Sequence, residues 1–516
     1  MKLDTLLSTL KHNMVLPPEW RDRDVQDIAQ DSRKVMPGSL FVAVRGFHSD
    51  GHQFIPQAVQ RGAAAIVAEE PASSAVSADM PYIIVEDTRQ ALALMADEFF
   101  GRPSQRLRLV GITGTNGKTT TTYLVKAVIE ASGSTAGLIG TIDYRIGNRV
   151  YPAPNTTPGS LELQRLLAEM ADSGADSCVM EVSSHALAQS RTLGCKFAVA
   201  AFTNLTQDHL DFHETMDAYF QAKLFLFTSL AQDAWAVINS DDAHAGDIIK
   251  AIRARVVTTG FSKHADVRPE GPIGHDLHGL SFDVATPEGV VTVESPLVGR
   301  HNISNILTAI GIGCAMGFEN KAIARGIKNM KAVPGRMEKV DEGQKFGVIV
   351  DYAHTEDALL RLLEAVRDVT QGRIITVFGC GGDRDWTKRP RMGAAAINGS
   401  DEVIVTSDNP RTEDPASIIR EIESGMSAGV RTQKGEPRKK SSGTTTASKI
   451  KHYHIIPDRA EAVAAAIEMA MPGDVVVLAG KGHEDYQVIG DTKIPFDDRE
   501  HARAALRTRP LHKVGG

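Results

Sequence analysis

The sequence predicts an α/β fold divided into three domains. The chain has 516 residues, which is too long for one ordinary hydrophobic core and corresponds to roughly three domains of about 150 residues. Short apolar segments alternate with helix-compatible stretches along most of its length, and a glycine-rich turn separates a strand-like segment from a helix-like one near residue 115. These observations favour a multidomain protein with a central nucleotide-binding domain.

Composition limits the kinds of partner. Hydrophobic residues make up 42% and charged residues 23%, as in folded soluble proteins. The net charge of −7 provides no basic surface for a nucleic-acid backbone, so no nucleic-acid partner is expected. The four cysteines form no CxxC pair, which fits a reducing cytoplasm. No signal peptide or apolar run of membrane-spanning length is apparent, so we expect a cytoplasmic protein with no membrane span.

Residues 1–105 form the first predicted domain. The apolar segments SLFVAV, AAAIVAEE and YIIVED predict strands, and the stretches between them fit helices. The tetrapeptide GRPS at 101–104 predicts a linker to the next domain. This part of the chain should be a small α/β domain.

Residues 106–332 form the second predicted domain, which begins with a strand, a glycine-rich turn and a helix. Backbone N–H groups of such a turn can bind phosphates, and Lys118 would neutralise their charge. Ile112 replaces the first glycine of the GxxxxGK[ST] pattern, so only the shorter GxxGKTT form is present. The pattern favours ATP binding over a merely flexible turn, but it does not choose among motors, switches, kinases and ligases. The turn consists of Gly114, Thr115, Asn116, Gly117, Lys118, Thr119 and Thr120.

Two later segments of this domain place polar residues directly after apolar strands. They are MEVSSH at 180–185 and FTNLTQDHLD at 202–211. Glu181 and His209 could be magnesium partners, although Mg²⁺ prefers oxygen ligands, and each segment alone could be purely structural. A predicted helix over 217–225 carries Lys223, which by itself would be interpreted as a solvated lysine, because only a neutral lysine reacts with CO₂ to form a carbamate.

Residues 333–516 form the third predicted domain. The strands FGVIVDYAH, RIITVFGCGG, DEVIVTSD and DVVVLAGKG predict a doubly wound sheet whose loops bind ligands. Arg384 occupies the final glycine position of GxGxxG, which argues against an NAD site. Residues 431–451 are basic and poor in large apolar side chains, and they predict an exposed insertion.

Eleven motifs in this order resemble the Mur ligase family over nearly the whole chain. The last three resemble most closely the members that add meso-diaminopimelate. The motifs are GTNGKTTTT, NTTPGSLELQ, MEVSSHAL, FTNLTQDHLDFH, FQAK, GRHNISNILTA, VPGRME, VIVDYAHTEDAL, VFGCGGDRD, TSDNPRTEDP and AGKGHEDYQ. The resemblance implies a three-domain Mur ligase architecture: a UDP-binding N-terminal domain, a central P-loop ATPase domain and a C-terminal Rossmann-like domain for the amino acid. It also implies a monomer.

The implied reaction joins meso-diaminopimelate to UDP-N-acetylmuramoyl-L-alanyl-D-glutamate in bacterial cell-wall synthesis. ATP activates the γ-carboxylate of the dipeptide as an acyl phosphate, which the amine of diaminopimelate then displaces, and Mg²⁺ with Lys118 offsets the charge during phosphoryl transfer. The implied catalytic residues are Lys118, Glu181, His209 and Lys223. The implied magnesium ligands are Thr119, Glu181, His209 and Lys223 carrying an N6-carboxyl (carbamate) group, which would supply the oxygen donors that magnesium prefers.

The resemblance also implies three binding sets. The residues for ATP are those of the glycine-rich turn together with Asn302, Arg336 and Asp351. Those for the UDP-muramoyl dipeptide are Ser32, Phe47, His48, Ser49, Asn155, Thr156, Thr157, Ser183, Gln189 and Arg191. Those for diaminopimelate are Arg384, Asp408, Asn409, Pro410, Arg411, Gly480 and Glu484. Without the family context, Asn302 would be interpreted as a helix cap, Arg336 as a linker charge and Glu484 as a surface acid balancing Lys481.

Three alternatives stay open at this point. One is a family member that adds lysine, and another is folylpolyglutamate synthase, which shares a related ATP module. A third, from another class, is a P-loop switch or motor acting on a macromolecule, for which the sequence offers no basic track.

Overall fold

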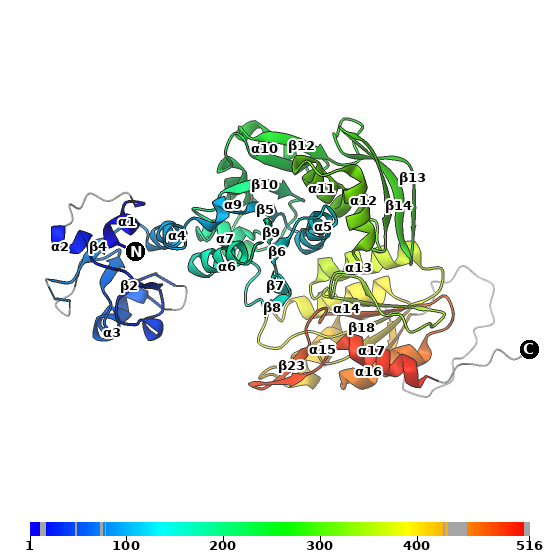
Figure 1. The fold of residues 1–516 in the computed structure, drawn as a ribbon. Coiled ribbons are helices and arrows are strands. Elements are labelled where there is room, and N and C mark those ends of the chain that lie inside the picture. Colours follow the sequence, from blue (N-terminus) through cyan, green and yellow to red (C-terminus); the bar gives the residue numbers. More distant parts are fainter. Residues whose placement is uncertain are drawn as a thin grey trace, which may run out of the picture. The chain divides into compact units, whose positions relative to one another are not determined.

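The computed structural model describes residues 1–10, 17–46, 49–72, 76–77, 79–426, 429–431 and 451–509. Figure 1 shows the elements in chain order, from α1 in blue to α17 in red. The chain forms two compact units, the first comprising Met1–Glu270, Val284–Val291 and Ser304–Ile327, and the second Gly271–Asp283, Thr292–Ile303 and Lys328–Gly516. Within the described ranges, no helix is both long and apolar enough to cross a bilayer.

A four-stranded parallel sheet in the order β1-β2-β3-β4 organises the N-terminal part of the first unit. Three of its strands are the predicted segments. Strands β2 and β3 are buried at every position because their apolar side chains are covered on both faces. The strands are β1 (Asp27–Ala29), β2 (Ser39–Val42), β3 (Ala65–Ala68) and β4 (Tyr82–Ile84), and the helices are α1 (Leu3–Leu7), α2 (Pro18–Arg21), α3 (Ile55–Gln60), α4 (Thr88–Phe99) and the 3₁₀ turns η1 (Ser32–Lys34), η2 (Gly51–Phe54) and η3 (Pro103–Gln105).

The segment predicted as a linker, 101–104, is a packed turn. Ser104 is buried, and its hydroxyl accepts a hydrogen bond from the Lys196 N–H at 3.0 Å. Close to this turn, the Asp97 side chain of α4 is only 9% exposed, and its Oδ1 makes no hydrogen bond within the described structure. Burial raises the pKa of Asp97 to about 6, although Arg102 lowers it. The folded chain therefore holds an incompletely satisfied carboxylate beside this turn.

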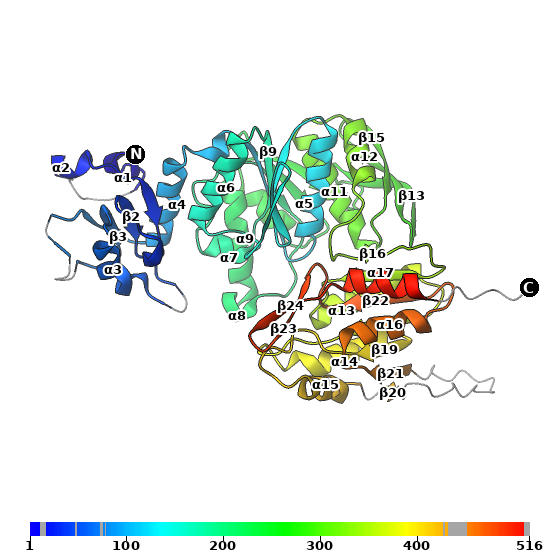
Figure 2. The same cartoon turned by 60° about the horizontal axis from the view of Figure 1, so that its bottom comes forward.

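An eight-stranded sheet in the order β12-β11-β10-β5-β9-β6-β7-β8 forms the rest of the first unit's core. Strand β5 lies between β10 and β9, and these three strands run parallel, so their carboxyl ends open on one edge. Figure 2 shows α6, α7 and α9 on one side of the sheet and α5 and α11 on the other. The strands are β5 (Arg108–Thr113), β6 (Ala136–Ile139), β7 (Asp143–Ile146), β8 (Arg149–Pro152), β9 (Ser177–Glu181), β10 (Phe197–Phe202), β11 (Trp235–Asn239) and β12 (Arg255–Thr259).

The helices of this region are α5 (Lys118–Ala131), α6 (Ser160–Asp172), α7 (Ser184–Ala188), α8 (Leu210–His213), α9 (Met216–Thr228), α10 (Ala245–Ala251), α11 (His301–Ala315) and α12 (Asn320–Asn329). A separate three-stranded sheet consists of β13 (Arg268–Asp276), β14 (Gly279–Thr286) and β15 (Gly289–Ser295). The predicted helix over 217–225 lies inside α9.

A seven-stranded sheet in the order β16-β17-β22-β18-β19-β21-β20 forms the core of the second unit. All neighbouring pairs are parallel except β16 with β17, and the four predicted strands are β17, β18, β19 and β22. The strands are β16 (Glu338–Lys339), β17 (Gly347–Asp351), β18 (Ile374–Phe378), β19 (Glu402–Val405), β20 (Gly429–Arg431), β21 (Lys451–Ile455) and β22 (Val475–Ala479), with a separate hairpin of β23 (Tyr486–Ile489) and β24 (Thr492–Pro495).

The ends of the predicted insertion at 431–451 differ from the expectation. Arg431 ends β20 and Lys451 begins β21, so both belong to the sheet, and the sequence segment 432–450 lies outside the described residues. The two strands are parallel neighbours. A β-branched or alternating pattern is too short in either strand to be recognised from the sequence.

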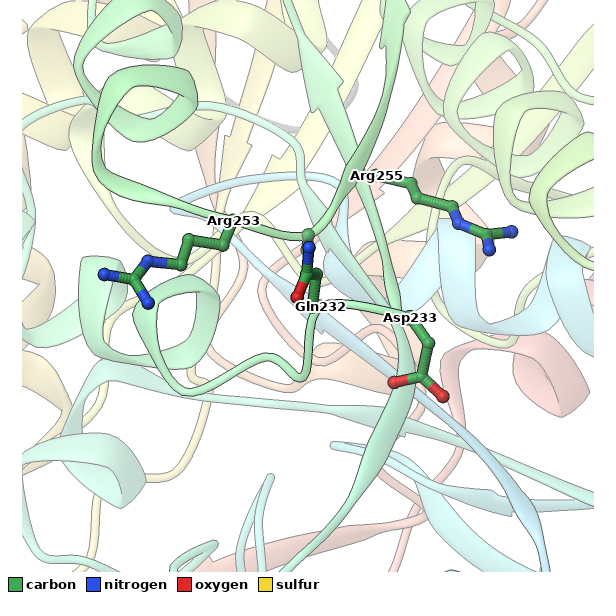
Figure 3. A pocket seen from close by; sticks show the side chains of 5 residues that line it. Gln232, Asp233, Arg253 and Arg255 are labelled. Carbon is green, nitrogen blue, oxygen red and sulfur yellow. The ribbon is translucent and has the colours of Figure 1, made fainter.

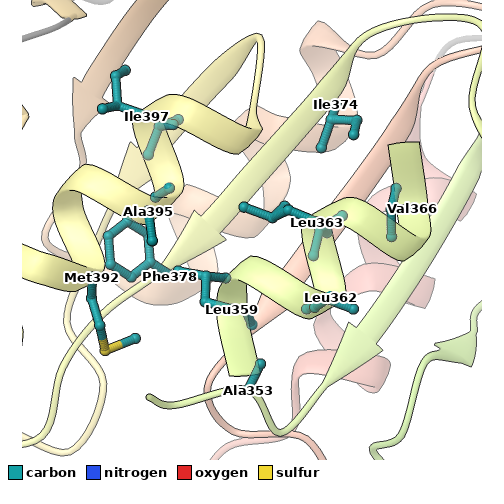
Figure 4. Close-up of a cluster of buried hydrophobic side chains, with 14 of the residues drawn as sticks. Ala353, Leu359, Leu362, Leu363, Val366, Ile374, Phe378, Met392, Ala395 and Ile397 are labelled. Atoms are coloured by element: carbon teal, nitrogen blue, oxygen red, sulfur yellow. The ribbon is translucent and has the colours of Figure 1, made fainter. Parts of the chain in front are cut away.

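Helices cover both faces of the seven-stranded sheet, as a doubly wound fold requires. One face packs against α13 (Glu356–Val369), α14 (Lys388–Gly399) and α15 (Pro415–Ser424), and Figure 4 shows part of this cluster around Leu359, Phe378 and Met392. The other face packs against α16 (Arg459–Met469) and α17 (Asp498–Thr508). Arg459 of α16 and Asp498 of α17 form a fully buried ion pair, with N–O distances of 2.8 and 2.7 Å.

Candidate active site

The glycine-rich turn joins β5 to α5 and requires glycine at two positions. Gly114 has φ +146°, and a Cβ there would lie 1.9 Å from the Thr203 hydroxyl oxygen. Gly117 has φ +85° at the helix N-cap, and a Cβ would lie 2.2 Å from Oδ1 of Asn305. Neither position can accommodate a side chain, so the backbone itself lines the start of α5, where N–H groups and the helix dipole favour an anion.

Two lysines donate to the same carbonyl oxygen of this turn. Lys118 Nζ lies 3.0 Å from the Gly114 oxygen and 2.9 Å from the Thr115 oxygen, and Lys223 Nζ of α9 lies 2.9 Å from the Gly114 oxygen. Lys223 is 1% exposed, and burial together with the charge of Lys118 holds its pKa well below the usual range. The interpretation of Lys223 as a solvated helix lysine is therefore wrong. The sequence of the helix does not reveal that this side chain is buried against the glycine-rich turn.

Thr119 and Glu181 meet at the carboxyl ends of β5 and β9. The Thr119 hydroxyl donates to Glu181 Oε2 at 2.9 Å, and Glu181 is 1% exposed. Thr141 completes the site, since its N–H donates to Oε1 at 2.8 Å and its hydroxyl to Oε2 at 3.1 Å. Three neutral donors thus hold the carboxylate in place with its oxygens beside the start of α5.

His209 lies in an aromatic group contributed by α7, α8 and α9. It has φ +54°, and its ring centroid lies 4.7 Å from that of His185 and 6.1 Å from that of Tyr219. Burial, with the charges of Lys118 and Lys223, lowers the pKa of His209, which favours the neutral imidazole. Tyr219 also lies under Lys223, whose Nζ is 4.4 Å from the ring centroid. The structure thus brings His209 into the neighbourhood of the two lysines.

No set of three His, Cys, Asp or Glu side chains converges as a metal-binding group in the described part of the chain. The oxygen donors near the turn are the Thr119 hydroxyl and the Glu181 carboxylate, which already lie at hydrogen-bond distance from each other. This pair fits one side of a magnesium site, because hard cations bind hydroxyl and carboxylate oxygens.

Four of the ten residues expected to bind the UDP-muramoyl dipeptide form one hydrogen-bonded group. Thr157 donates to the Glu181 carbonyl oxygen at 2.8 Å, and its hydroxyl accepts from the Ser183 N–H at 3.0 Å. Arg191 donates to the Thr157 carbonyl oxygen and to Gln189 Oε1, each at 2.8 Å. This group adjoins the Glu181 site through the Thr157 bond.

The two residues before Thr157 are also in this neighbourhood. The Thr156 hydroxyl lies 3.0 Å from that of Thr141, and the Asn155 carbonyl oxygen accepts from the Tyr144 hydroxyl at 2.6 Å. The remaining expected contacts belong to the four-stranded sheet region, where Ser32 is buried and donates to Gln57 Oε1 at 2.7 Å and Ser49 is exposed. Phe47 and His48 lie outside the described residues.

In the second unit, Arg336 and Asp351 lie on neighbouring segments. The Asp351 carboxylate accepts from the N–H groups of Met337 and Ala353 at 2.7 and 2.8 Å, and burial raises its pKa. The Arg336 guanidinium lies 4.8 Å from the Tyr352 ring centroid. Asn302 lies in the first turn of α11, and its amide donates to the Val298 oxygen at 2.7 Å.

The segment of Arg336 is joined to the GKGHE segment by backbone contacts. The Gly480 N–H donates to the Asp351 carbonyl oxygen at 3.0 Å, and the Tyr352 N–H donates to the Gly335 oxygen at 2.9 Å. Gly335 has φ +66°, and a Cβ there would lie 2.1 Å from the His483 nitrogen. This close backbone contact, the Gly335 clasp, holds the expected nucleotide and amino-acid segments of the unit together.

The residues expected to bind diaminopimelate gather at the carboxyl ends of β18, β19 and β22. Asp408 and Asn409 are buried after β19, and a Cβ at Gly480 would lie 3.6 Å from Asp408 Oδ2. Asn409 Nδ2 donates to Glu484 Oε2 at 3.0 Å. The interpretation of Glu484 as a surface acid is wrong, because its side chain is 17% exposed and its partner Lys481 is completely buried.

Two arginines border this group at the Gly381 loop. A Cβ at Gly381 would lie 3.2 Å from Arg411 Nη1 and 3.9 Å from Arg384 Cγ. Arg411 has φ +50°; its N–H donates to the Val488 oxygen, and its guanidinium donates to the Gly382 oxygen. Pro410 packs its carbonyl group against Gly382. The seven expected residues are therefore together on one sheet edge, with two cations and two acids among them.

Sequence reasoning missed several partners of these residues. Thr141 supports Glu181, Asn305 packs against Gly117, and Lys481 lies between Asp408 and Glu484. The contacts of Thr141 and Asn305, and that of Lys481 with Asp408, join segments far apart in the chain, so no local sequence pattern indicates them. Only the pairing of Lys481 with Glu484 is local, and the sequence had suggested it. The motif GKGHE, which contains both Lys481 and Glu484, was the one sequence signal for these contacts.

A hollow of about 580 Å³ lies away from these residues. It is lined by Gln232, Asp233, Arg253, Ala254 and Arg255, and Figure 3 shows Arg253 and Arg255 pointing to opposite sides. These residues lie just before β11 and at the start of β12, two strands that run parallel to β10 and β5. The hollow is therefore at the amino edge of the sheet, opposite the glycine-rich turn, and is not the candidate site.

Comparison with known proteins bears on the whole chain. Three family models match it: "Mur ligase family, catalytic domain" over residues 24–100, "Mur ligase middle domain" over 112–313, and "Mur ligase, glutamate ligase domain" over 335–482. A UDP-N-acetylmuramoyl-L-alanyl-D-glutamate–2,6-diaminopimelate ligase of Geobacillus thermodenitrificans is 48% identical, covering 99% of this chain and all of that protein.

Solved structures show the same fold. One described as a UDP-N-acetylmuramoyl-L-alanyl-D-glutamate–2,6-diaminopimelate ligase has a TM-score of 0.70 and 33% identity, covering 98% of this chain and 99% of its own. A folylpolyglutamate synthase of Mycobacterium tuberculosis, solved with ADP and AMPPCP, has a TM-score of 0.58 at 17% identity, covering 82% and 96%, which is a likeness of fold alone. The α/β fold, the three matched regions and the full-length relatives together show that the chain belongs to the Mur ligase family.

Proposed function

We propose that the chain is an ATP-dependent amide-bond ligase that adds meso-diaminopimelate to UDP-N-acetylmuramoyl-L-alanyl-D-glutamate. Relatives named as UDP-N-acetylmuramoyl-L-alanyl-D-glutamate–2,6-diaminopimelate ligases are 45–48% identical over essentially the whole chain. The structural observation that carries the proposal is the site at the glycine-rich turn. Lys118 and Lys223 both donate to the Gly114 oxygen, and Thr119 donates to the carboxylate of Glu181, whose backbone carbonyl accepts from Thr157.

The proposed reaction has two steps. A carboxylate oxygen of the dipeptide attacks the γ-phosphorus of ATP, the bond to the β-phosphate oxygen breaks, and ADP leaves. An amine of diaminopimelate then attacks the acyl carbon, phosphate leaves with its bonding electrons, and the amine loses a proton. Activation is required because a free carboxylate resists attack by an amine.

The turn and Lys118 would hold the phosphates. The backbone N–H groups at the start of α5 provide fixed donors, and Lys118 can exchange its two carbonyl partners for phosphate oxygens. Thr119 and Glu181 would hold Mg²⁺, which when bound compensates the negative charge gathered in phosphoryl transfer. His209 would assist at a second cation, with Asn302, Arg336 and Asp351 contacting the nucleotide.

Lys223 would act as a carbamate. Its lowered pKa favours the neutral amine that reacts with CO₂. The N6-carboxyl group would place a negative charge, in place of a second lysine amine, beside Lys118 at the Gly114 oxygen. The product is an anion beside Lys118 that offers oxygen to a hard cation.

The substrate-binding residues are assigned according to the sheets that they lie beside. Asn155, Thr156, Thr157, Ser183, Gln189 and Arg191 would contact the muramoyl dipeptide, with Ser32, Phe47, His48 and Ser49 at the UDP group. The seven residues around Asp408 would bind diaminopimelate, whose zwitterionic end suits paired arginines and acids. We assign residues 1–105, 106–332 and 333–516 to the UDP, ATP and amino-acid domains, and we expect a cytoplasmic monomer.

The test is ADP release in the presence of the UDP-muramoyl dipeptide, with and without meso-diaminopimelate. Rapid release only when both acceptors are present, with formation of the tripeptide product, is expected. Equal turnover with lysine would favour the lysine-adding class. ATP turnover that ignores both compounds would contradict the proposal.

A further inference from the structure

Lys481 is a completely buried cation inside the group proposed to bind diaminopimelate. Its side chain is 0% exposed, and its Nζ lies 3.2 Å from Asp408 Oδ1, 3.1 Å from Asn409 Oδ1 and 3.4 Å from Glu484 Oε2. One ammonium group thus contacts three side chains from two loops. Burying a lysine ammonium destabilises the folded state unless paired and hydrogen-bonded partners compensate for the lost hydration.

The bonds to Glu484 are directional. Both Lys481 and Asn409 donate to the same oxygen, Oε2, at 3.4 and 3.0 Å. The other oxygen, Oε1, is not used by either of them. Asn409 is in turn fixed, because its Oδ1 accepts from Lys481 and from the Val488 N–H at 2.9 Å. The rotation of the Glu484 carboxylate is therefore set by two donors on one side.

The charge of Lys481 also helps to hold the Glu484 carboxylate in its orientation. Asp408 and Glu484 are both acids on this sheet edge, and Lys481 lies within salt-bridge distance of both. Without the ammonium, the two carboxylates would repel each other, and Glu484 would be free to turn toward solvent. An ammonium group of a substrate would then meet a mobile acceptor and would have to order it on binding.

We propose that Lys481 is a positioning residue for the amino-acid substrate, which orients Glu484 so that its Oε1 receives the distal ammonium group of diaminopimelate. This inference rests on the proposed function. It assigns to Lys481 an effect on one group of the substrate rather than a general effect on the fold.

The experiment compares two substrates that differ in that group. Diaminopimelate carries the distal ammonium, whereas 2-aminopimelate keeps the distal carboxylate and lacks the amine. In Lys481→Met, the KM for diaminopimelate should rise about tenfold or more, the loss expected for a hydrogen bond to a charged group. The KM for 2-aminopimelate and the KM for ATP should change by less than about twofold, as for independent sites.

A second set of variants covers the case in which Lys481→Met fails to fold. Lys481→Gln keeps a hydrogen-bonding side chain, and the double variant Lys481→Met with Glu484→Gln removes one charge of each sign. In the Glu484→Gln background, losing Lys481 should add less than about twofold to the KM for diaminopimelate, because Lys481 acts through Glu484.

Arg373→Met is the matched control. Arg373 forms an ion pair with the buried Asp474 at 2.6 Å, and both residues directly precede strands β18 and β22, at the edge opposite the Asp408 group. This variant should lower the denaturation midpoint and leave the ratio of the two KM values unchanged.

Equal increases in both KM values, or additive effects of Lys481→Met and Glu484→Gln, would overturn the positioning role while the ligase assignment stood. If the unmodified protein showed no turnover that depends on diaminopimelate, both the proposed function and this inference would fail. A selective increase for diaminopimelate, absent in Arg373→Met, would establish it.

Discussion

Arg411 presents its guanidinium from an unusual backbone conformation, and its replacement tests amino-acid selection. A non-glycine residue at φ +50° costs of order 1 kcal/mol or more, and here the N–H bond to Val488 holds the conformation. A bidentate arginine–carboxylate pair is directional and about twice as strong as a neutral hydrogen bond. We therefore expect Arg411 to bind the distal carboxylate of diaminopimelate.

The expected magnitude follows from that pair. Losing hydrogen bonds to a charged group costs about 1.5–3 kcal/mol. At about 1.4 kcal/mol per factor of ten, Arg411→Ala should raise the KM for diaminopimelate roughly 10- to 150-fold. The KM values for ATP and the UDP-muramoyl dipeptide should change little, and the preference for diaminopimelate over lysine in a competition assay should fall by a similar factor, because lysine lacks the distal carboxylate.

Arg411→Gly separates the side chain from the backbone. Glycine adopts positive φ without strain, so this variant should be about 1 kcal/mol more stable than Arg411→Ala while losing the same selectivity. Arg391→Ala, at an exposed arginine of α14, is the control. Full preference for diaminopimelate in both Arg411 variants would refute the reasoning, and a loss in the alanine variant alone would assign the effect to the backbone.

Four further predictions follow from the structure. Lys223→Ala should nearly abolish ligation, and partial recovery of turnover with a short carboxylic acid would support the carbamate, whereas normal turnover without it would reject it. Shortening the segment 432–450 to about a dozen residues should preserve activity, but joining β20 directly to β21 should not, because parallel neighbours need a crossover connection of about that length; loss of diaminopimelate binding in the shortened protein would show that the segment is functional. Asp498→Asn should lower the free energy of unfolding in urea by about 3–5 kcal/mol, since it leaves Arg459 buried and unpaired, and a change below about 1 kcal/mol would contradict this. Because the pKa of Asp97 is raised in the folded state, stability should fall as the pH rises from about 4 to about 6, and Asp97→Asn should remove this dependence and stabilise the protein at pH 8 by about 1–3 kcal/mol; an unchanged pH profile would count against it.

Local patterns were sufficient for much of the fold. The apolar runs of β17, β18, β19 and β22 are continuous because parallel strands are buried on both faces, and the glycine-rich turn falls between a strand and a helix, as predicted. Strands β20 and β21 escaped prediction because they are short and border a polar segment.

The environment of individual side chains depended on tertiary contacts. In the sequence, nothing distinguishes Lys223 from a solvated helix lysine. Its side chain is buried because α9 packs against the glycine-rich turn. In the same way, the pairing of Lys481 with Asp408 joins the ends of β22 and β19, which the chain order does not reveal. The motifs supplied the expected site residues, whereas the burial and the charged neighbours of each side chain depended on the assembled sheets.

The Gly335 clasp limits how this protein could escape an inhibitor by mutation. Any side chain at Gly335 would collide with the backbone at His483, and φ +66° disfavours every other residue. The collision would disturb the segment of Arg336 and that of Glu484 together, since the Gly480 N–H and the Asp351 carbonyl connect them. A compound that contacts the backbone of this clasp would therefore meet a surface where a single substitution that weakens inhibitor binding also disturbs the segments proposed to bind the nucleotide and diaminopimelate. Resistance by that route would require at least one compensating change in a second loop.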